Sequence, residues 1–390
     1  MEWKEVYIKD ICTVLGDGLH GTPEYDEKGD FYFINGNNLQ EGHITIKKDT
    51  KRVSQKEFLK YQKELNDRTI LVSINGTIGN VAKYNNEPCI LGKSACFFNV
   101  KEDIDRNFIY YVISSPHFKK SIIQQATGTT IKNVSLKQMR DYHFLIPVNL
   151  SDQRKIAGIL SALDSKIENN NKINANLEAQ AEALFKSWFV DFTPFKDQPF
   201  VDSELGPIPQ GWKVGTLFDV ANLHDRYRRP LSSNQRSLMA KKYPYYGATS
   251  LMDFVEDYIF DGEYVLMGED GSVVTEKGYP FIQYVWGKIW VNNHAHVLSG
   301  KDGFPTELLI PFLKTYNIKG LVTGAVQAKL NQANMAKIQI PIPPKENINN
   351  ISVIIKSIYK KYRLLTEENQ RLAALRDTLL PKLMSGEIKL

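Results

Sequence analysis

Histidine, cysteine and carboxylate side chains could do chemistry in this sequence, but their spacing offers little support for it. His294 and His296 stand two residues apart, so on a strand they would share one face as a pair of metal ligands. No cysteine or carboxylate pair accompanies them at metal-ligand spacing, so we interpret them as hydrogen-bonded strand histidines. None of the seven histidines lies beside a serine or cysteine in a recognisable nucleophile motif.

Motifs that bind nucleotides are also missing. The run 91–94 resembles the end of a phosphate-binding loop, but Glu87 stands where the first glycine belongs, so we interpret the run as a strand turn. The sequence has no strand-Gly-x-Gly-helix run for a dinucleotide or S-adenosylmethionine. A nuclease-like group ending in Glu387 and Lys389 lacks an upstream carboxylate partner. The sequence therefore favours a binding module over an enzyme, with no catalytic and no metal-binding residue.

A basic segment interleaved with tyrosines, residues 224–250, offers groups suited to DNA. It holds four arginines and two lysines. Arg and Lys neutralise phosphates, and Arg also donates two hydrogen bonds to a guanine edge. The alternative is a solvated charged loop, which is the commoner meaning of a single basic run. The candidates that this segment supplies are Arg226, Arg228, Arg229, Lys241, Lys242, Tyr246 and Thr249.

Loops rich in glycine, asparagine and threonine supply the other candidates. The loop 16–30 is glycine-rich, and the run 34–39 carries amides that suit adenine edges, although Asn-Gly is also ordinary turn chemistry. The loops 127–133 and 323–331 both begin with Thr-Gly, which suits phosphate contact or the capping of a short helix. The candidates from these loops and the neighbouring turns are His20, Thr22, Asn35, Asn37, Asn38, Asn75, Thr77, Lys93, Thr129, Thr130, Lys132, Ser272, Gln327 and Lys329.

The elements that must position these loops repeat once along the chain. The run 126–139 matches 322–335, and 144–148 matches 340–344 at the same offset. The ends of the two halves agree while their middles diverge, which predicts one architecture that presents two different surfaces. Within each half, short β-rich runs with Asn-Gly or Asp-Gly turns precede small helices, which predicts an α+β domain with a mixed or antiparallel sheet.

Each half then ends in a long helix, the first running from Ser151 or Asp152 to about Val190. Apolar residues recur alternately four and three positions apart, which is the coiled-coil period. Asn174 maps onto Asn369, so we expect antiparallel helices with these two side chains close together. A simple amphipathic surface helix is the alternative. The predicted seam comprises Ile156, Leu160, Leu163, Ile167, Asn174, Leu177, Leu184, Ile351, Ile355, Ile358, Leu365, Asn369, Leu372 and Leu379.

Composition and length exclude several classes of protein. Of the 390 residues 42% are hydrophobic and 24% charged, which is typical of a globular protein of two or three domains. No run approaches the 18 apolar residues of a membrane span, and three cysteines without paired spacing argue against a disulfide framework. The net charge of +5 permits DNA binding without requiring it. The predicted division is a first domain at 1–150, a first helix at 151–192, a linker and second domain at 193–345, and a second helix at 346–390.

The whole chain resembles the specificity subunit of type I restriction-modification enzymes. The resemblance rests on "LGPIPQGW" (205–212), which opens the second half, and on the helix ends "ALFKSWFVDF" (183–192) and "LRDTLLPKLMSGEI" (375–388). It implies an α+β fold in which two pseudo-repeated mixed β-sheet target-recognition domains are separated by two long antiparallel coiled-coil helices. The helices would set the length of the unread gap, so four residues inserted into 151–190 would lengthen that gap by one or two base pairs.

The resemblance also implies a function. Such a subunit is non-catalytic and cytoplasmic, and it reads a bipartite, asymmetric target in double-stranded DNA, one half-site per domain. It docks two modification (methyltransferase) subunits and restriction (translocase/nuclease) subunits. By this resemblance the chain binds no cofactor, while its partners use S-adenosylmethionine, ATP and magnesium. The alternatives are a self-sufficient DNA-modifying enzyme or nuclease with an unrecognised active site, and a structural adaptor that does not touch DNA.

Overall fold

The computed structural model describes residues 1–128, 132–324, 327–388 and 390, which form two compact units. Unit 1 comprises Met1–Asn169 and Glu368–Leu390, and unit 2 comprises Asn170–Glu367. Two 40-residue helices, α6 (Leu150–Phe189) and α11 (Lys345–Met384), each contribute one end to unit 1 and the other to unit 2. The candidates Thr129 and Thr130 lie outside the described residues.

Unit 1 is organised around a four-stranded antiparallel sheet in the order β2-β10-β7-β8. The side chains of β7 and β10 alternate between two cores. Ile70 and Phe98 face the core that contains the helices, whereas Leu71 and Phe97 face the core shared with β3 and β9. Both strands are therefore buried along their whole length. The strands are β2 (Cys12–Asp17), β7 (Thr69–Ser73), β8 (Val81–Lys83) and β10 (Ala95–Val100).

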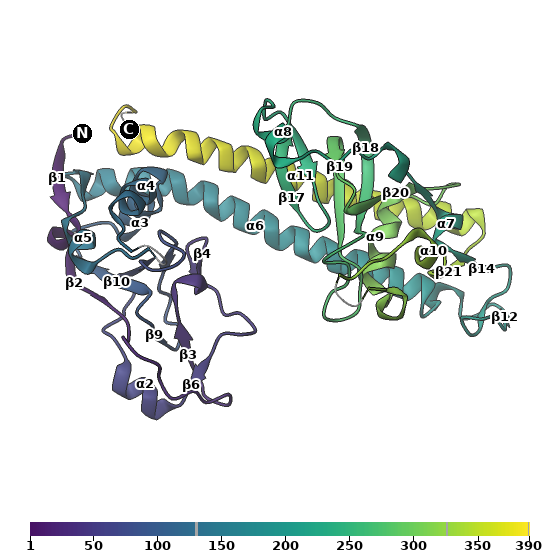
Figure 1. Cartoon of the computed structure of the whole chain (residues 1–390), viewed down its shortest axis with the longest axis horizontal. Coiled ribbons are helices and arrows are strands. Elements are labelled where there is room, and N and C mark those ends of the chain that lie inside the picture. The colour runs from purple at the N-terminus through teal and green to yellow at the C-terminus, as the bar shows by residue number, and fades with distance from the viewer. Residues whose placement is uncertain (129–131, 325–326, 389) are drawn as a thin grey trace. The chain divides into compact units, whose positions relative to one another are not determined.

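Smaller elements surround this sheet. Figure 1 shows α3 and α4 against α6, with β3, β6 and α2 on the side away from it. A three-stranded sheet has the order β6-β3-β9, in which β3 and β9 are parallel, and β4 pairs with β5. The bounds are α2 (Gln55–Tyr61), α3 (Arg106–Ser114), α4 (Pro116–Gln125), β3 (Phe31–Ile34), η1 (Gly36–Asn38), β4 (Leu39–Gln40), β5 (His43–Ile44), β6 (Arg52–Val53) and β9 (Cys89–Leu91).

Unit 2 contains a six-stranded sheet in the order β15-β20-β18-β19-β16-β17, beside which α9 packs (Figure 1). The pairing of β16 with β19 is parallel and the other pairings are antiparallel. The bounds are η2 (Thr193–Phe195), β12 (Phe200–Val201), β13 (Ile208–Pro209), β15 (Ala221–Leu223), η3 (Asp225–Tyr227), α8 (Ser233–Ser237), β16 (Tyr243–Tyr246), β17 (Leu251–Val255), β18 (Phe260–Gly268), β19 (Ile282–Val291), β20 (Ala295–Gly300), α9 (Thr306–Thr315), η4 (Lys319–Leu321) and α10 (Gln332–Met335).

The predicted repeat is present in the fold. The first strand of each half pairs antiparallel with the last, so that Lys4 lies opposite Ile146 and Lys213 opposite Ile342. Each half contains a mixed set of strands, which confirms the predicted α+β fold with two pseudo-repeated mixed β-sheet domains. The matching elements are β1 (Trp3–Tyr7), α1 (Ile8–Ile11), α5 (Leu136–Asp141) and β11 (His143–Pro147) in unit 1, and β14 (Lys213–Thr216), α7 (Leu217–Val220) and β21 (Gln339–Ile342) in unit 2.

The two long helices run antiparallel within each unit. In unit 1, Ile156 and Leu160 of α6 share a core with Leu380 and Leu383 of α11. A 2.7 Å ion pair between Asp164 and Arg376 joins the same two helices. The shared apolar core and this ion pair therefore hold the two helices against each other within unit 1.

In unit 2 the helix pair has a polar position within its apolar seam. Asn174 is 8% exposed and its Nδ2 donates to Thr366 Oγ1 at 3.0 Å. Further along, Phe185 shares a core with Ile355 and Tyr359. The expected pairing of Asn174 with Asn369 joins residues of different units and stays a prediction. Among the residues that the structure describes, no helix is both long and apolar enough to span a lipid bilayer.

Candidate nucleic-acid interface

The polar loops of unit 1 meet where several of its strands end. The Ile74 amide, just after β7, donates to the Ser94 carbonyl at 3.0 Å, and the Gly36 amide, just after β3, donates to Ser94 Oγ at 2.9 Å. The Lys93 amide donates to the Leu19 carbonyl at 3.0 Å, which adds the loop after β2. We call the loops and turns 18–22, 35–37, 75–77, 92–94 and 132–133 the unit 1 edge.

Three candidates project from one part of the unit 1 edge. His20, Thr22 and Lys93 are all exposed. The His20 ring is held by Asp17, whose Oδ2 lies 2.6 Å from Nε2. The edge therefore presents an imidazole, a hydroxyl and an ammonium group, a mixture that suits bases and phosphates.

The three asparagines of the run 34–39 have different roles. Asn38 is 4% exposed, and its side chain donates to the Thr45 carbonyl and to Thr50 Oγ1, both at 3.0 Å. Asn35 is half-buried and accepts from Ser94 Oγ at 3.0 Å. Asn37 is exposed. Asn37 is therefore the amide of this run that is free to meet a ligand, while Asn35 and Asn38 hold the turn.

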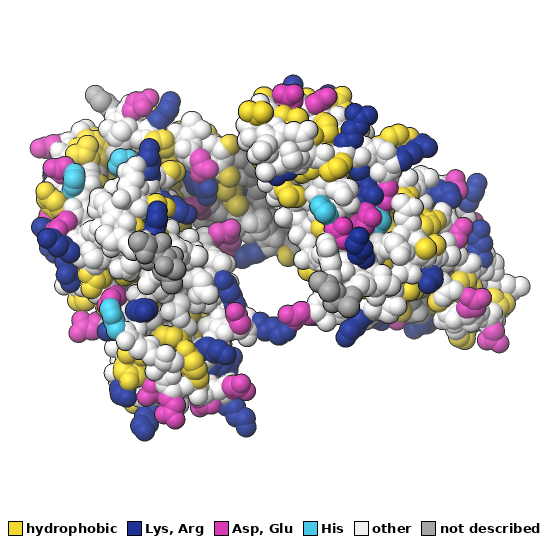
Figure 2. Space-filling model, viewed as in Figure 1, with side chains coloured by type: hydrophobic (Ala, Val, Ile, Leu, Met, Phe, Trp, Pro, Cys, Tyr) yellow, Lys and Arg dark blue, Asp and Glu magenta, His cyan; other side chains and the backbone are white. Residues whose placement is uncertain are grey.

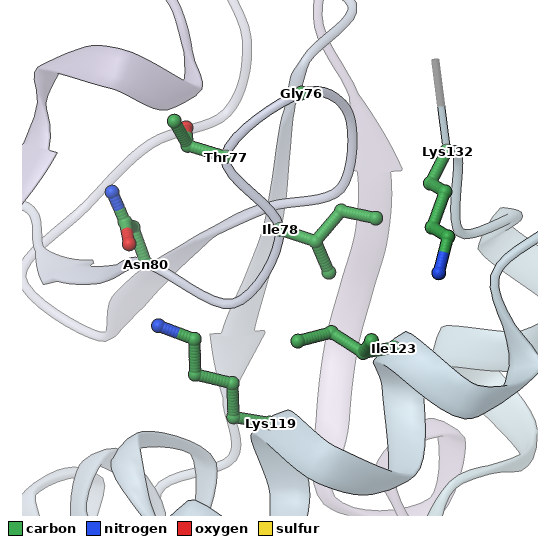
Figure 3. Close-up of a pocket in the computed structure, with 7 residues that line it drawn as sticks. All are labelled: Gly76, Thr77, Ile78, Asn80, Lys119, Ile123 and Lys132. Carbon is green, nitrogen blue, oxygen red and sulfur yellow. The ribbon is translucent and has the colours of Figure 1, made fainter. Parts of the chain in front are cut away.

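A cavity of about 610 Å³ opens beside the turn of Asn75 and Gly76 (Figure 3). Asn75 forms a bridge with Asn133, which brings the loop that carries Lys132 to the same place. Figure 3 shows Lys119 and Lys132 on opposite sides of Ile78 and Ile123. Thr77 also lines the cavity, so the structure brings together Asn75, Thr77 and Lys132 as candidates.

Lys119 was not among the sequence candidates. It lies in α4, where a lysine in the sequence is most simply explained as part of a solvated helix face. The signal that could have indicated it is the pair Lys119–Lys120, which closely follows the helix start at Pro116. Two ammonium groups around an open cavity suit a phosphate group, which carries the opposite charge and accepts hydrogen bonds.

The equivalent strand ends form an edge in unit 2. The Gly271 amide donates to the Ala328 carbonyl at 3.0 Å, and the Asn292 amide donates to the Tyr246 carbonyl at 3.1 Å. We call residues 224–229, 246–250, 269–272, 292–294 and 327–332 the unit 2 edge. Of the candidates on its turns, Thr249, Ser272, Gln327 and Lys329 are exposed, and Tyr246 is half-buried, which raises the pKa of its hydroxyl.

The basic segment 224–250 divides into separate parts. Arg226 and Arg229 are exposed on the unit 2 edge, and the Arg226 guanidinium stacks on the Tyr227 ring at 4.6 Å. Lys241 and Lys242 lie at the other end of β16, where Lys241 Nζ pairs with Asp253 at 2.9 Å. The structure therefore does not bring these two lysines together with the edge.

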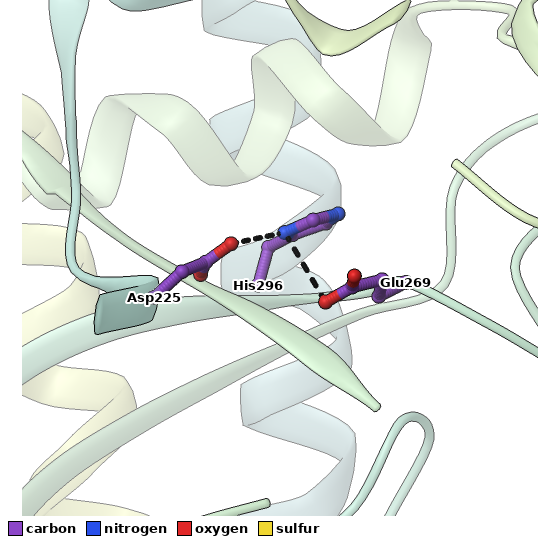
Figure 4. A group of neighbouring side chains, drawn as sticks. All are labelled: Asp225, Glu269 and His296. Carbon is purple, nitrogen blue, oxygen red and sulfur yellow. Dashed lines mark hydrogen bonds and ion pairs between the residues drawn. The ribbon is translucent and has the colours of Figure 1, made fainter. Parts of the chain in front are cut away.

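Arg228 belongs to a buried group of charged residues. His296 is fully buried, with Nδ1 2.6 Å from Asp225 Oδ2 and Nε2 2.7 Å from the Leu330 carbonyl. Asp225, Glu269 and His296 place one ligand atom each within 4.8 Å of one another, a spacing that could hold a metal ion (Figure 4). The Arg228 guanidinium, however, contacts the same Asp225 Oδ2 and Glu269 Oε2, so it already supplies positive charge there.

The electrostatics of this group follow from its burial and its pairings. Burial alone raises the pKa of the Asp225 carboxyl, but the hydrogen bonds and charges of His296, the Val297 amide and Arg228 together lower that pKa below its usual value. Asp225 is therefore a carboxylate that receives donors from several directions. Figure 2 shows acidic and basic side chains interspersed over the face in view, so the charges of this chain are not gathered into one uniformly basic surface.

The chain thus contains two copies of one α+β frame, each with a differently composed polar edge. The chain matches the family described as the type I restriction modification DNA specificity domain, over residues 1–179 and 209–374. It belongs to that family.

Individual relatives agree with this assignment. The MjaIX specificity subunit of a type I restriction enzyme from Methanocaldococcus jannaschii is 26% identical over all of this chain and 94% of that protein. The putative subunit S.HindORF215P from Haemophilus influenzae is 38% identical over 148 residues, which span 38% of this chain and 37% of that protein. The crystal structure of the type I restriction-modification S subunit from M. genitalium shares the fold, with a TM-score of 0.59 and 20% identity over 98% of this chain and 96% of that one.

Proposed function

We propose that the chain reads a bipartite, asymmetric target in double-stranded DNA, with the unit 1 edge reading one half-site and the unit 2 edge the other. The observation that carries the proposal is the repeated strand-end frame with unlike side chains. The unit 1 edge presents His20, Asn37 and Lys93, and the unit 2 edge presents Arg226, Ser272 and Gln327. Because two different surfaces recognise two different sequences, the target is asymmetric.

Contacts to DNA divide by chemistry. Exposed lysines such as Lys132 and Lys329 neutralise phosphates and position the duplex. Exposed amides, hydroxyls and arginines such as Asn37, Thr249 and Arg229 are suited to base edges, where the pattern of donors and acceptors distinguishes one base pair from another. Affinity and specificity are thus supplied by different side chains on the same edge.

The long helices are suited to binding protein partners. Three apolar side chains of α11 are exposed to solvent: Val353 by 73%, Ile354 by 44% and Leu364 by 50%. Exposed apolar side chains that lie together on a surface are typical of a site that binds another protein. We assign these helices to the docking of two modification subunits and of restriction subunits in the cytoplasm. Methylation and cleavage, with S-adenosylmethionine, ATP and magnesium, then belong to those partners, and this chain is non-catalytic.

An exchange of domains tests the proposal. Residues 211–340 are replaced by the equivalent segment of another family member, and the methylated sites of the host genome are mapped by sequencing. We expect one half of the bipartite target to change while the other half stays the same. A target that changes in both halves contradicts the assignment of one half-site to each unit. Methylation or cleavage of DNA by the purified chain alone supports the alternative of a self-sufficient enzyme.

A further inference from the structure

Four ionisable side chains form a hydrogen-bonded group at the unit 2 edge. We call Asp225, Arg228, Glu269 and His296 the charged cluster; Figure 4 shows three of them. The side chains of Arg228 and Asp225 are 11% and 6% exposed, and that of His296 is 0% exposed. The Glu269 side chain is 30% exposed, so a DNA duplex laid on the edge could reach Glu269 but would meet other residues before Asp225, Arg228 and His296.

The charged cluster ties three loops of the edge together. Asp225 and Arg228 lie in the loop 224–229, and Glu269 begins the turn 269–272. The loop 327–332 is joined twice, because the Leu330 carbonyl accepts from His296 Nε2 at 2.7 Å and Gln332 Nε2 donates to Asp225 Oδ2 at 3.1 Å. Each of these loops also carries exposed candidates for DNA contact, namely Arg226 and Arg229, Ser272, and Gln327 and Lys329.

Hydrogen bonding within the charged cluster leaves little room for rearrangement. Both ring nitrogens of His296 lie within hydrogen-bond distance of an oxygen, Nδ1 of the Asp225 carboxylate and Nε2 of the Leu330 carbonyl. Arg228 donates to Glu269 and, at 2.7 Å, to the Ala295 carbonyl. The Arg228 guanidinium thus faces two carboxylates, and its removal would leave the largely buried Asp225 carboxylate without that cationic partner.

The frame of unit 1 uses different chemistry at the same place. His296 lies opposite Met267 across β18 and β20, and at the matching position of unit 1 Cys96 lies opposite Val72 across β7 and β10. Cys96 is buried, and that burial raises the pKa of its thiol. Neutral hydroxyl groups hold the unit 1 turns instead, since Ser73 Oγ donates to the Thr77 carbonyl and accepts from the Asn80 amide at 2.9 Å.

We propose that the charged cluster is a positioning device of unit 2, which sets the half-site specificity of that unit by fixing three reading loops rather than by reading bases itself. The inference rests on the proposed function. Its physical basis is that a reading side chain must be held within a fraction of an ångström, which loops achieve only when their own anchors are rigid. Arg228, Asp225, Glu269 and His296 are thus positioning residues.

The test uses the assembled complex with its modification subunits. Methylation rates are measured on a panel of duplexes, each with one base pair changed in one half-site. For Arg228→Ala we expect discrimination in the half-site of unit 2 to fall by about tenfold, with discrimination in the other half-site unchanged. Arg228→Lys, which keeps the charge but not the two-pronged geometry, should restore part of it.

A control comes from outside the unit 2 edge. Lys242→Ala removes an exposed cation at the other end of β16, so it should leave discrimination in both half-sites unchanged. Two milder variants keep the test decisive if Arg228→Ala folds poorly. Glu269→Gln keeps nearly the same shape and Gln332→Ala removes one hydrogen bond, and both should lower discrimination in the half-site of unit 2. Equal slowing of all duplexes by Arg228→Ala, or unchanged discrimination in the milder variants, overturns the inference. A wild-type complex without discrimination in either half-site instead overturns the proposed function.

Discussion

Replacing Lys119 and Lys132 together with alanine should weaken the salt dependence of DNA binding by an amount that the structure allows us to work out. Both lysines line the cavity of about 610 Å³ beside the unit 1 edge. Within the described part of the chain, neither ammonium group forms an ion pair. Both are therefore available to displace counterions from DNA phosphates.

The magnitude follows from the release of those counterions. Each phosphate contact contributes about −0.9 to the slope of log affinity against log salt concentration, so loss of two contacts reduces the slope by about 1.8. Between about 50 and 200 mM salt, the wild-type complex should lose about 12-fold more affinity than the double variant loses. The single variant Lys119→Ala should show about a 3.5-fold difference over the same range.

Fluorescence anisotropy of the assembled complex on a labelled target duplex, repeated across a salt series, measures these slopes. Lys120→Ala is the matched control, since Lys120 neighbours Lys119 on α4 but does not line the cavity. The reasoning is refuted if the double variant keeps the wild-type slope, or if Lys120→Ala flattens the slope as much as Lys119→Ala.

Three further predictions concern the stability of unit 2. Arg363→Ala removes the cation that pairs with Glu263 at 2.6 Å and with the buried Glu307 at 3.7 Å, so urea titration should show a loss of about 3 kcal/mol in unfolding free energy; an unchanged midpoint would contradict this. Burial raises the pKa of Glu307, which makes its charged form less favourable in the folded than in the unfolded chain, so the stability linked to the protonated form is lost as pH rises through the folded-state pKa; Glu307→Gln should therefore unfold at higher urea than wild type at pH 8, with the difference shrinking in acid. Asn174→Leu should raise the unfolding free energy by about 1 kcal/mol, because Thr366 keeps its bond to the Tyr362 carbonyl, and a destabilised variant would show that the polar pair is needed.

Periodic and repeated features of the sequence predicted the architecture well. The apolar spacing predicted a helix from Ser151 or Asp152 to about Val190, and α6 runs from Leu150 to Phe189. The matching runs around Thr127 and Thr323 predicted equivalent loops, and these form bridges with Asn133 and Lys329 respectively. Such features were visible because they depend on residues close together in sequence or on direct comparison of two segments.

Partners distant in sequence could not be predicted in the same way. Arg228 is paired with Glu269 and His296 lies beside Asp225, contacts that depend on the strand order of the sheet. Asn38 resembles a base-reading amide in the sequence, but tertiary contacts bury it. A residue type shows which bonds are available, and only the packing of strands from different parts of the chain decides which of them are used.

Unit 1 is built from two segments that lie far apart in the sequence, and this affects how the newly synthesised chain folds. The ribosome delivers residues 1–169 first, but Leu380 and Leu383, which cover Ile156 and Leu160, come from the segment 368–390. Translation of the roughly 200 residues in between takes at least about 10 s at ordinary elongation rates. Unit 2, whose residues are continuous in sequence, is complete before unit 1. Until residue 383 has been synthesised, Ile156 and Leu160 lack the apolar side chains of α11 that share their core in the finished chain.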